Sequence, residues 1–81
     1  MTKRYVLTID LGTSGPKVSL FTLDGDHLGG EFTAVDLVLI GDHGVEQRPD
    51  DWWAGIVSAA QRLWEQVDVD PSEVAAVSVT S

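Results

Sequence analysis

The residues best suited to chemistry lie together in one short stretch near the amino terminus. The stretch reads Asp10-Leu11-Gly12-Thr13-Ser14-Gly15-Pro16-Lys17 and joins two expected strands. Gly12 and Gly15 let a ligand approach the backbone closely and present N–H groups to an anion. Thr13 and Ser14 add hydroxyl donors beside those amides. These residue types suit the phosphates of a nucleotide.

Two charged residues flank this turn. Asp10 could hold Mg²⁺ directly or through water, because Mg²⁺ takes few protein carboxylates and keeps several waters. Lys17 offers a point charge to phosphate oxygens. On composition alone an ordinary hairpin loop is the commoner interpretation, with an aspartate that bonds turn amides.

Strands and turns are expected to position these residues. Residues 5–9 are β-branched and aromatic and predict a buried strand, and residues 17–23 predict a second one. Asp24-Gly25 predicts a tight hairpin turn with positive φ at both positions. A third strand is expected between residues 27 and 40, and Gly29-Gly30 near its start indicates a bulge.

A helix is expected after a loop at residues 41–44. Pro49 fits the first helical position, and Asp50 and Asp51 lie in the first turn, beside the positive end of the helix dipole. Apolar residues then recur with the helical period and predict one face packed on a sheet: Trp53, Ile56, Val57, Ala60, Leu63, Trp64 and Val67. We expect Trp53 and Trp64 to be core residues rather than a platform for a sugar. A break at residues 68–73 precedes a last strand at 74–79.

The predicted fold is therefore α/β. Three strands form an antiparallel meander, and the helix is a crossover that returns the last strand parallel to the first. In an open α/β sheet the loop after that strand contributes to the site. The chain stops at Ser81, directly after the strand, so we expect an incomplete domain.

Composition disfavours several classes of function. Thirteen acidic residues against five basic ones give a formal charge of −8, and the cations are scattered, which disfavours nucleic acids and anionic membranes. There is no cysteine, and His27 and His43 have no partner at metal-ligand spacing. The start lacks the apolar run and cleavage site of a secretory signal, and no stretch approaches a membrane span, so a cytoplasmic protein is expected.

The order of the residues resembles a specific family. Ile9-Asp10-Leu11-Gly12-Thr13-Ser14 followed by Lys17-Val18 is similar to the first phosphate loop of the actin-like ATPase and sugar kinase superfamily. Val45-Glu46-Gln47-Arg48-Pro49-Asp50-Asp51-Trp52-Trp53 resembles the Glu-Gln-Asp-Pro-Glu-x-Trp-Trp stretch of FGGY carbohydrate kinases. The spacing of the two motifs and the closing residues 77–81 also fit that family. The residues of the motifs look similar to those of xylulokinase-like members.

The resemblance implies a ribonuclease-H-like (actin-like ATPase) fold, of which residues 1–81 would be the N-terminal part of the first domain. It implies a parent enzyme that uses Mg²⁺ and transfers the γ-phosphate of ATP to a hydroxyl of a xylulose-like sugar or polyol. By position, Asp10 would be the metal-linked carboxylate, residues 12–15 the phosphate loop and Lys17 the basic residue after it. The catalytic base and the adenosine site would lie outside this segment, so the 81 residues alone are expected to be inactive.

Two residues depart from the family pattern. Pro16 removes one backbone donor from the loop. Arg48 replaces the aspartate that would cap the helix, which costs about 1 kcal/mol, and Asp50 and Asp51 offset part of that cost.

Two other functions stay open. A ribonuclease-H-like nuclease would need more carboxylates around two metals, for which Asp50 and Asp51 are candidates. A non-catalytic module would associate with itself, as a homo-oligomer, through unpaired sheet edges and an exposed helix face.

Overall fold

The computed structural model describes residues 4–35, 38–40, 44–46 and 48–81. Its elements in chain order are β1 (Tyr5–Gly12), β2 (Gly15–Thr22), β3 (His27–Phe32), β4 (Val38–Ile40), β5 (Gly44–Glu46), α1 (Pro49–Gln66), the short 3₁₀ helix η1 (Pro71–Glu73) and β6 (Val74–Thr80). Most of the loop expected at residues 41–44, including His43, lies outside the described residues. Within the described part, neither helix has the length and hydrophobicity needed to cross a membrane.

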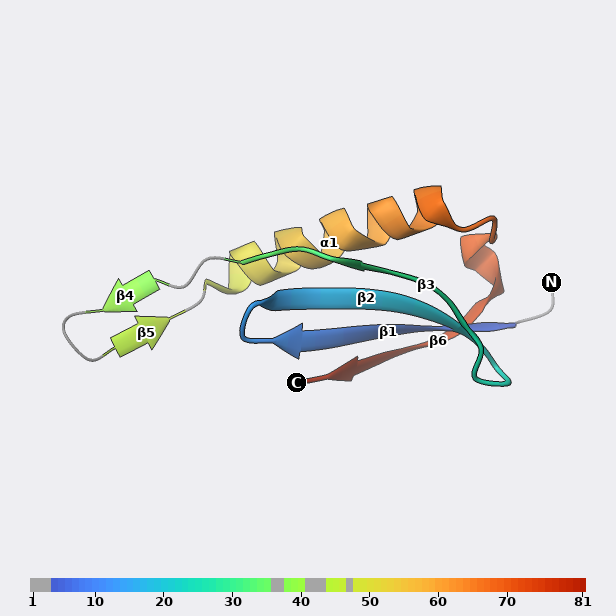
Figure 1. Cartoon of the computed structure of the whole chain (residues 1–81), viewed down its shortest axis with the longest axis horizontal. Coiled ribbons are helices and arrows are strands. Elements are labelled where there is room, and N and C mark those ends of the chain that lie inside the picture. Colours follow the sequence, from blue (N-terminus) through green and yellow to red (C-terminus); the bar gives the residue numbers. More distant parts are fainter. Residues whose placement is uncertain (1–3, 36–37, 41–43, 47) are drawn as a thin grey trace.

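The main sheet has four strands in the order β3-β2-β1-β6 (Figure 1). β2 is antiparallel to both β1 and β3, and β6 is parallel to β1. The meander, the crossover helix and the parallel return of the last strand are thereby confirmed. β4 and β5 form a separate two-stranded antiparallel sheet that projects beyond one end of the main sheet and was not predicted from the sequence.

Both hairpin turns of the main sheet are followed by a glycine in the left-handed half of φ space. Gly15 has φ of 140° and Gly25 has φ of 97°, and among the described residues no other type has positive φ. The Gly25 amide donates to the Thr22 carbonyl at 3.0 Å. The prediction of positive φ at Asp24 is therefore wrong, because an ordinary turn followed by one glycine closes the longer connection.

The predicted bulge lies in β3, at its start. The register between β2 and β3 shifts between the pairs Leu20–Gly29 and Phe21–His27, so Leu28 is the extra residue. A Cβ atom at Gly29 would press on the side chains of Gln66 and Val67. Glycine at this position lets the end of α1 approach the strand closely.

Helix α1 packs on β2 and β3 and closes a small core. Val18 and Leu20 from β2 and Ala59 and Leu63 from α1 are fully buried, and these partly buried residues surround them: Tyr5, Leu7, Ile9, Ile56, Ala60, Trp64, Val67, Val69 and Val74. The partial burial of Trp64 agrees with the expected core role.

Trp53 is 66% exposed, so its prediction as a core residue is wrong. The buried line of α1 runs through Gly55, Ala59 and Leu63, with a spacing of four residues. Trp53 precedes Gly55 by two positions and so lies about 200° around the helix from it. Pro49, Asp50 and Asp51 occupy the first turn as predicted, and Arg48 stands at the N-cap without a capping hydrogen bond from its side chain.

Candidate functional site

The candidate site lies at one end of the main sheet. There the β1–β2 turn meets the carboxyl end of β6, and α1 begins nearby (Figure 1). Because β1 and β6 are parallel, their carboxyl ends reach the same end of the sheet, where ligands bind in open α/β sheets. The turn itself is shorter than predicted, since only Thr13 and Ser14 separate the two strands.

Asp10 stands in one row with Lys17 of β2 and Thr80 of β6. Its neighbour Ile9 packs on the core beneath α1, and side chains alternate along a strand, so Asp10 points to the opposite face of the sheet. We call this the far face. All three residues of the row are exposed. The sheet therefore places a carboxylate, an ammonium and a hydroxyl side by side at the root of the turn.

Gly12 and Gly15 differ in what the fold requires of them. A Cβ atom at Gly12 would find only the Gly15 carbonyl oxygen, at an ordinary contact distance of 3.7 Å. At Gly15, positive φ is combined with a clash between the added Cβ and the Thr33 carbonyl oxygen. The fold thus requires glycine at position 15, whereas the exposed surface at Gly12 is open to a ligand.

The segment after β3 is hydrogen-bonded to the β1–β2 turn. We call residues 33–35 the strap. The Val35 amide donates to the Ser14 carbonyl at 3.0 Å, and the Thr33 amide donates to the Pro16 carbonyl at 3.1 Å. The strap residues Thr33 and Val35 thereby bond both sides of Gly15, which is itself buried.

Pro16 belongs to this support and is fully buried. A Cβ atom at Gly55 of α1 would lie 3.1 Å from the Pro16 ring, so helix and turn touch closely here. In a strand the N and carbonyl of one residue point to the same side, and the Pro16 carbonyl points to the strap. The donor that proline lacks would therefore face the strap rather than the outer surface of the turn.

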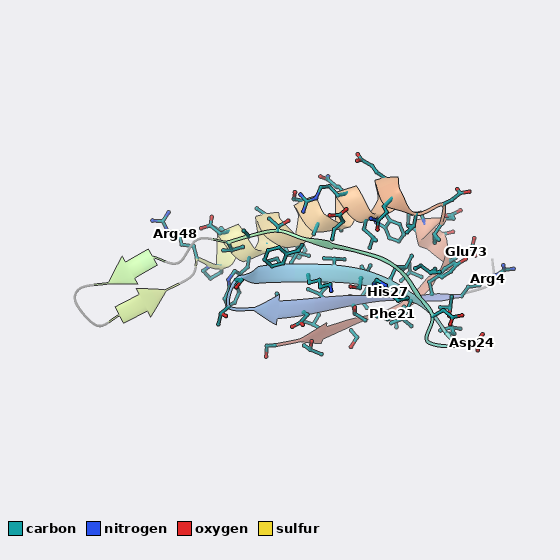
Figure 2. All side chains as sticks on the ribbon, viewed as in Figure 1. Arg4, Phe21, Asp24, His27, Arg48 and Glu73 are labelled. Atoms are coloured by element: carbon teal, nitrogen blue, oxygen red, sulfur yellow. The ribbon has the colours of Figure 1, made fainter. Side chains whose placement is uncertain are left out.

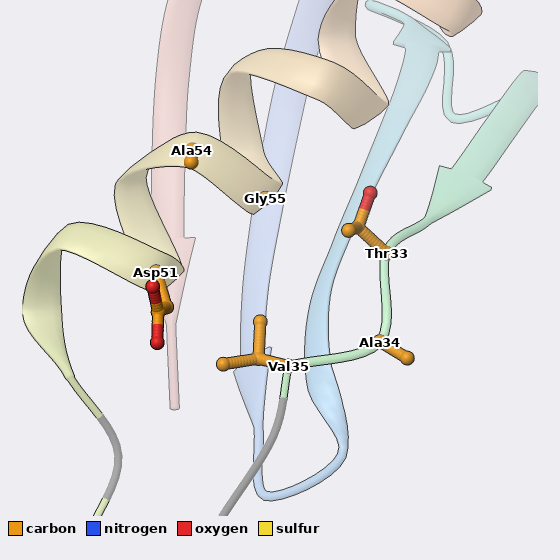
Figure 3. Close-up of a pocket in the computed structure, with 6 residues that line it drawn as sticks. All are labelled: Thr33, Ala34, Val35, Asp51, Ala54 and Gly55. Carbon is orange, nitrogen blue, oxygen red and sulfur yellow. The ribbon is translucent and has the colours of Figure 1, made fainter.

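A shallow depression of about 310 Å³ lies between the strap and the start of α1 (Figure 3). It is lined by Thr33, Ala34, Val35, Asp51, Ala54 and Gly55. Asp51 thus lies on the α1 side, whereas Asp10 points to the far face. The sheet separates these two carboxylates, which removes the support for a two-metal nuclease centre built from them.

The donor set around Asp10 fits a magnesium nucleotide. One exposed carboxylate, two exposed hydroxyl side chains, a lysine and an open glycine meet at a single turn. Among the described residues no cluster of three or more His, Cys, Asp or Glu could hold a metal by itself. A magnesium ion bound mainly through phosphate oxygens and water needs no such cluster.

Arg62 was not predicted to contribute to this region. Its guanidinium donates to the Phe32 carbonyl at 2.8 Å and to the Thr33 hydroxyl at 2.7 Å. The sequence shows Ser58 one helical turn before Arg62, and these two side chains do bond, at 2.7 Å. No local signal indicates the contacts with residues 32 and 33, because they join segments some thirty positions apart.

Comparison with known proteins gives a consistent result. The model of the FGGY family of carbohydrate kinases, N-terminal domain, matches residues 5–81. Glycerol kinase from Halalkalibacterium halodurans is 28% identical over 81 residues, which are 100% of this chain and 16% of that protein. Glycerol kinases from Carboxydothermus hydrogenoformans and Symbiobacterium thermophilum are 30% and 32% identical, with the same coverage. The chain thus spans 16% of the length of these relatives.

Proposed function

Because this chain belongs to the FGGY family of carbohydrate kinases, as an N-terminal domain, we propose that it forms the phosphate-binding part of a longer ATP-dependent kinase. In that enzyme, residues 1–81 are an incomplete first domain. The observation that carries the proposal is the row of Asp10, Lys17 and Thr80, exposed beside the β1–β2 turn.

In this proposal the residues of the turn bind and orient phosphate. Asp10 holds Mg²⁺ directly or through a water molecule. Gly12 lets a phosphate approach the backbone closely, Thr13 and Ser14 face its oxygens from the two turn positions between the paired Gly12 and Gly15, and Lys17 adds a positive charge. Bound Mg²⁺ would supply charge neutralisation at the phosphate oxygens. The contribution of this segment is positioning, which accounts for much of the catalysis in phosphoryl transfer.

The acceptor is proposed to be a hydroxyl of a small polyol or sugar. The three relatives above carry the name glycerol kinase, which supports a polyol. The motif at residues 45–53 resembles xylulokinase-like members, which supports a ketose such as xylulose. Assays with glycerol and with xylulose separate the two. A cytoplasmic location belongs to the same proposal, since ATP and phosphorylated sugars are handled there.

The test of the metal role is Asp10→Ala in the full-length protein that carries this segment. We expect the kcat/KM for ATP to fall by more than about tenfold, since lost stabilisation of the transition state appears in that ratio. Asp24→Ala is the matched control, because Asp24 is an exposed aspartate in the hairpin turn at the other end of the sheet (Figure 2). A loss below tenfold for Asp10→Ala, or an equal loss in both variants, contradicts the proposal.

The segment alone is proposed to be inactive. It contains neither a catalytic base nor an adenosine site by the family resemblance, so the purified chain should bind Mg·ATP weakly and hydrolyse none of it. Calorimetric titration and a coupled assay with glycerol or xylulose measure both properties. Acceptor-dependent turnover of ATP by the 81 residues would overturn this part.

A further inference from the structure

We propose that Arg62 is a positioning residue for the phosphate turn and acts through the strap. This inference rests on the proposed binding of phosphate at residues 12–15. Arg62 lies on α1 and contacts the helix side of the sheet, whereas Asp10 and Lys17 face the far side. Arg62 therefore does not touch the nucleotide in this proposal, and its effect must be transmitted by the backbone.

The Arg62 guanidinium bonds three segments at once. One terminal nitrogen, Nη2, donates to the Phe32 carbonyl at 2.8 Å and to the Thr33 hydroxyl at 2.7 Å. The other, Nη1, donates to Ser58 of the helix at 2.7 Å. Nε lies 3.5 Å from a carboxylate oxygen of Glu31 on β3. A planar fork with several fixed donors can hold such a set of acceptors, and the single ammonium of lysine cannot reproduce it.

The position of the Arg62 contacts explains how they can affect the β1–β2 turn. Arg62 binds the last residue of β3 and the first residue of the strap, at the point where an edge strand of the sheet ends. The next contacts along the chain are those of the Thr33 and Val35 amides with the Pro16 and Ser14 carbonyls. Thr33 thus bonds Arg62 through its hydroxyl and the turn through its amide. A shift of Thr33 is passed directly to Pro16 and, through Val35, to Ser14 on the other side of Gly15.

The strap also restricts the position of the turn backbone. The Thr33 carbonyl oxygen lies so close to Gly15 that no side chain fits between them. The strap, once fixed by Arg62, therefore determines where the peptide groups at residues 14–16 stand. A turn that binds an anion must be held in place before the ligand arrives, because ordering its backbone on binding would cost affinity.

The test uses Arg62→Met and Arg62→Lys in the full-length protein. Methionine keeps an apolar stem for packing and removes the donors, and lysine keeps the charge without the fork. We expect the KM for ATP to rise about five- to tenfold in both, the size expected for a lost charge-assisted hydrogen bond. The KM for the polyol or sugar and the kcat should change by less than twofold at a temperature well below unfolding. Lost folding alone would lower the apparent kcat and leave the KM for ATP unchanged.

Arg4→Met is the matched control. Arg4 forms an ion pair with Glu73 at 3.6 Å at the opposite end of the sheet (Figure 2). This variant removes a comparable exposed ion pair and should leave the KM for ATP unchanged. If Arg62→Met does not fold, Thr33→Val provides a milder variant, because it keeps the side-chain shape and removes only the hydroxyl that Arg62 binds.

Hydrogen exchange of the nucleotide-free protein separates this inference from the proposed function. Arg62→Met should speed the exchange of the Thr33 and Val35 amides, and Arg4→Met should not. Unchanged exchange in Arg62→Met overturns the inference, whatever Asp10→Ala does. Faster exchange with an unchanged KM for ATP overturns it as well. The proposed function falls with it only if Asp10→Ala is also without effect.

Discussion

The space available for a Cβ atom determines which glycine of the β1–β2 turn tolerates substitution. At Gly15 the positive φ and the nearby Thr33 carbonyl leave no room for a side chain. At Gly12 a Cβ atom meets only the Gly15 carbonyl oxygen, at 3.7 Å, and φ is ordinary. The turn thus contains one glycine that the fold requires, Gly15, and one that the fold does not require, Gly12.

We predict that Gly15→Ala and Gly12→Ala separate folding from binding. Gly15→Ala should lower the free energy of unfolding by about 1–3 kcal/mol or more, because strain adds to the clash with Thr33. Gly12→Ala should change it by less than about 1 kcal/mol. In the full-length protein, however, Gly12→Ala should weaken binding of Mg·ATP. Urea unfolding and nucleotide titration measure the two effects, and full nucleotide affinity in Gly12→Ala would contradict a phosphate site at this turn.

Asp70 provides a second prediction at this scale. Its carboxylate caps η1 by accepting from the Ser72 amide at 2.9 Å. The hydrogen bonds from the Ser72 backbone and side chain lower the pKa of Asp70 below its usual value of 3.8. A lowered pKa in the folded state means that the charged carboxylate stabilises the fold above this usual value. The stabilisation is lost as the pH falls through that value toward the lower pKa of the folded state.

The control for Asp70 is Asp70→Asn, which keeps a capping oxygen but does not titrate in this range. The native chain should be more stable than this variant at neutral pH, and the difference should shrink when the pH is lowered below 3.8. Urea unfolding of both proteins across that range measures it. A difference that is constant with pH would mean that the charge of Asp70 does not contribute.

At the scale of elements, α1 packs on the sheet through a narrow line of small and aliphatic residues. Gly55, Ala59 and Leu63 face the sheet, and Gly55 lies against Pro16 just behind the turn. The aromatic residues flank this line instead of forming it, with Trp64 half-buried and Trp53 mostly exposed. Close contact of the helix with β2 is therefore what connects the core to the candidate site.

This arrangement predicts opposite sensitivities for two large residues of α1. Leu63 is 0% exposed, and Leu63→Ala should cost about 2–5 kcal/mol in the free energy of unfolding, which is a large part of the stability of a small domain. Trp53 is 66% exposed, and Trp53→Ala should cost less than about 1 kcal/mol. Equal losses in urea unfolding would show that Trp53 packs against something in solution.

At the scale of the whole molecule, α1 covers only part of one face of the main sheet. α1 covers β2 and β3, whereas β6 is an edge strand whose Val77 and Val79 are 56% and 58% exposed. An exposed apolar edge strand offers unpaired backbone groups and hydrophobic area to another chain. We therefore predict that the isolated 81-residue chain associates with itself.

Sedimentation equilibrium at two or more protein concentrations tests this prediction. The apparent mass should rise with concentration above the 8.7 kDa of the single chain. Val79→Lys should reduce the association, because a charge at an edge strand opposes pairing. Lys17→Gln, which removes a charge from an interior strand on the far face, is the control and should not. A mass of one chain at all concentrations would contradict the prediction.

Much of this protein was predictable from local patterns in the sequence. β-branched and aromatic residues predicted the first strand, the helical period and Pro49 predicted α1, and the order of elements then left few topologies. The motif around Asp10 and the stretch at residues 45–53 identified the family, which the match over residues 5–81 bears out. Such signals operate between neighbours in the chain, so their meaning does not depend on the rest of the fold.

The remaining features depend on contacts between distant segments. The exposure of Trp53, the strap behind Gly15 and the contacts of Arg62 follow from how α1 and β3 pack on β2. The same sequence pattern permits several rotations of a helix on its sheet, and in the observed one Gly55 fits against Pro16 and Gly29 lies beneath Gln66. The sequence by itself indicated which residues are candidates for binding phosphate. The tertiary structure decided how they are held, because atoms from three separate segments have to meet there.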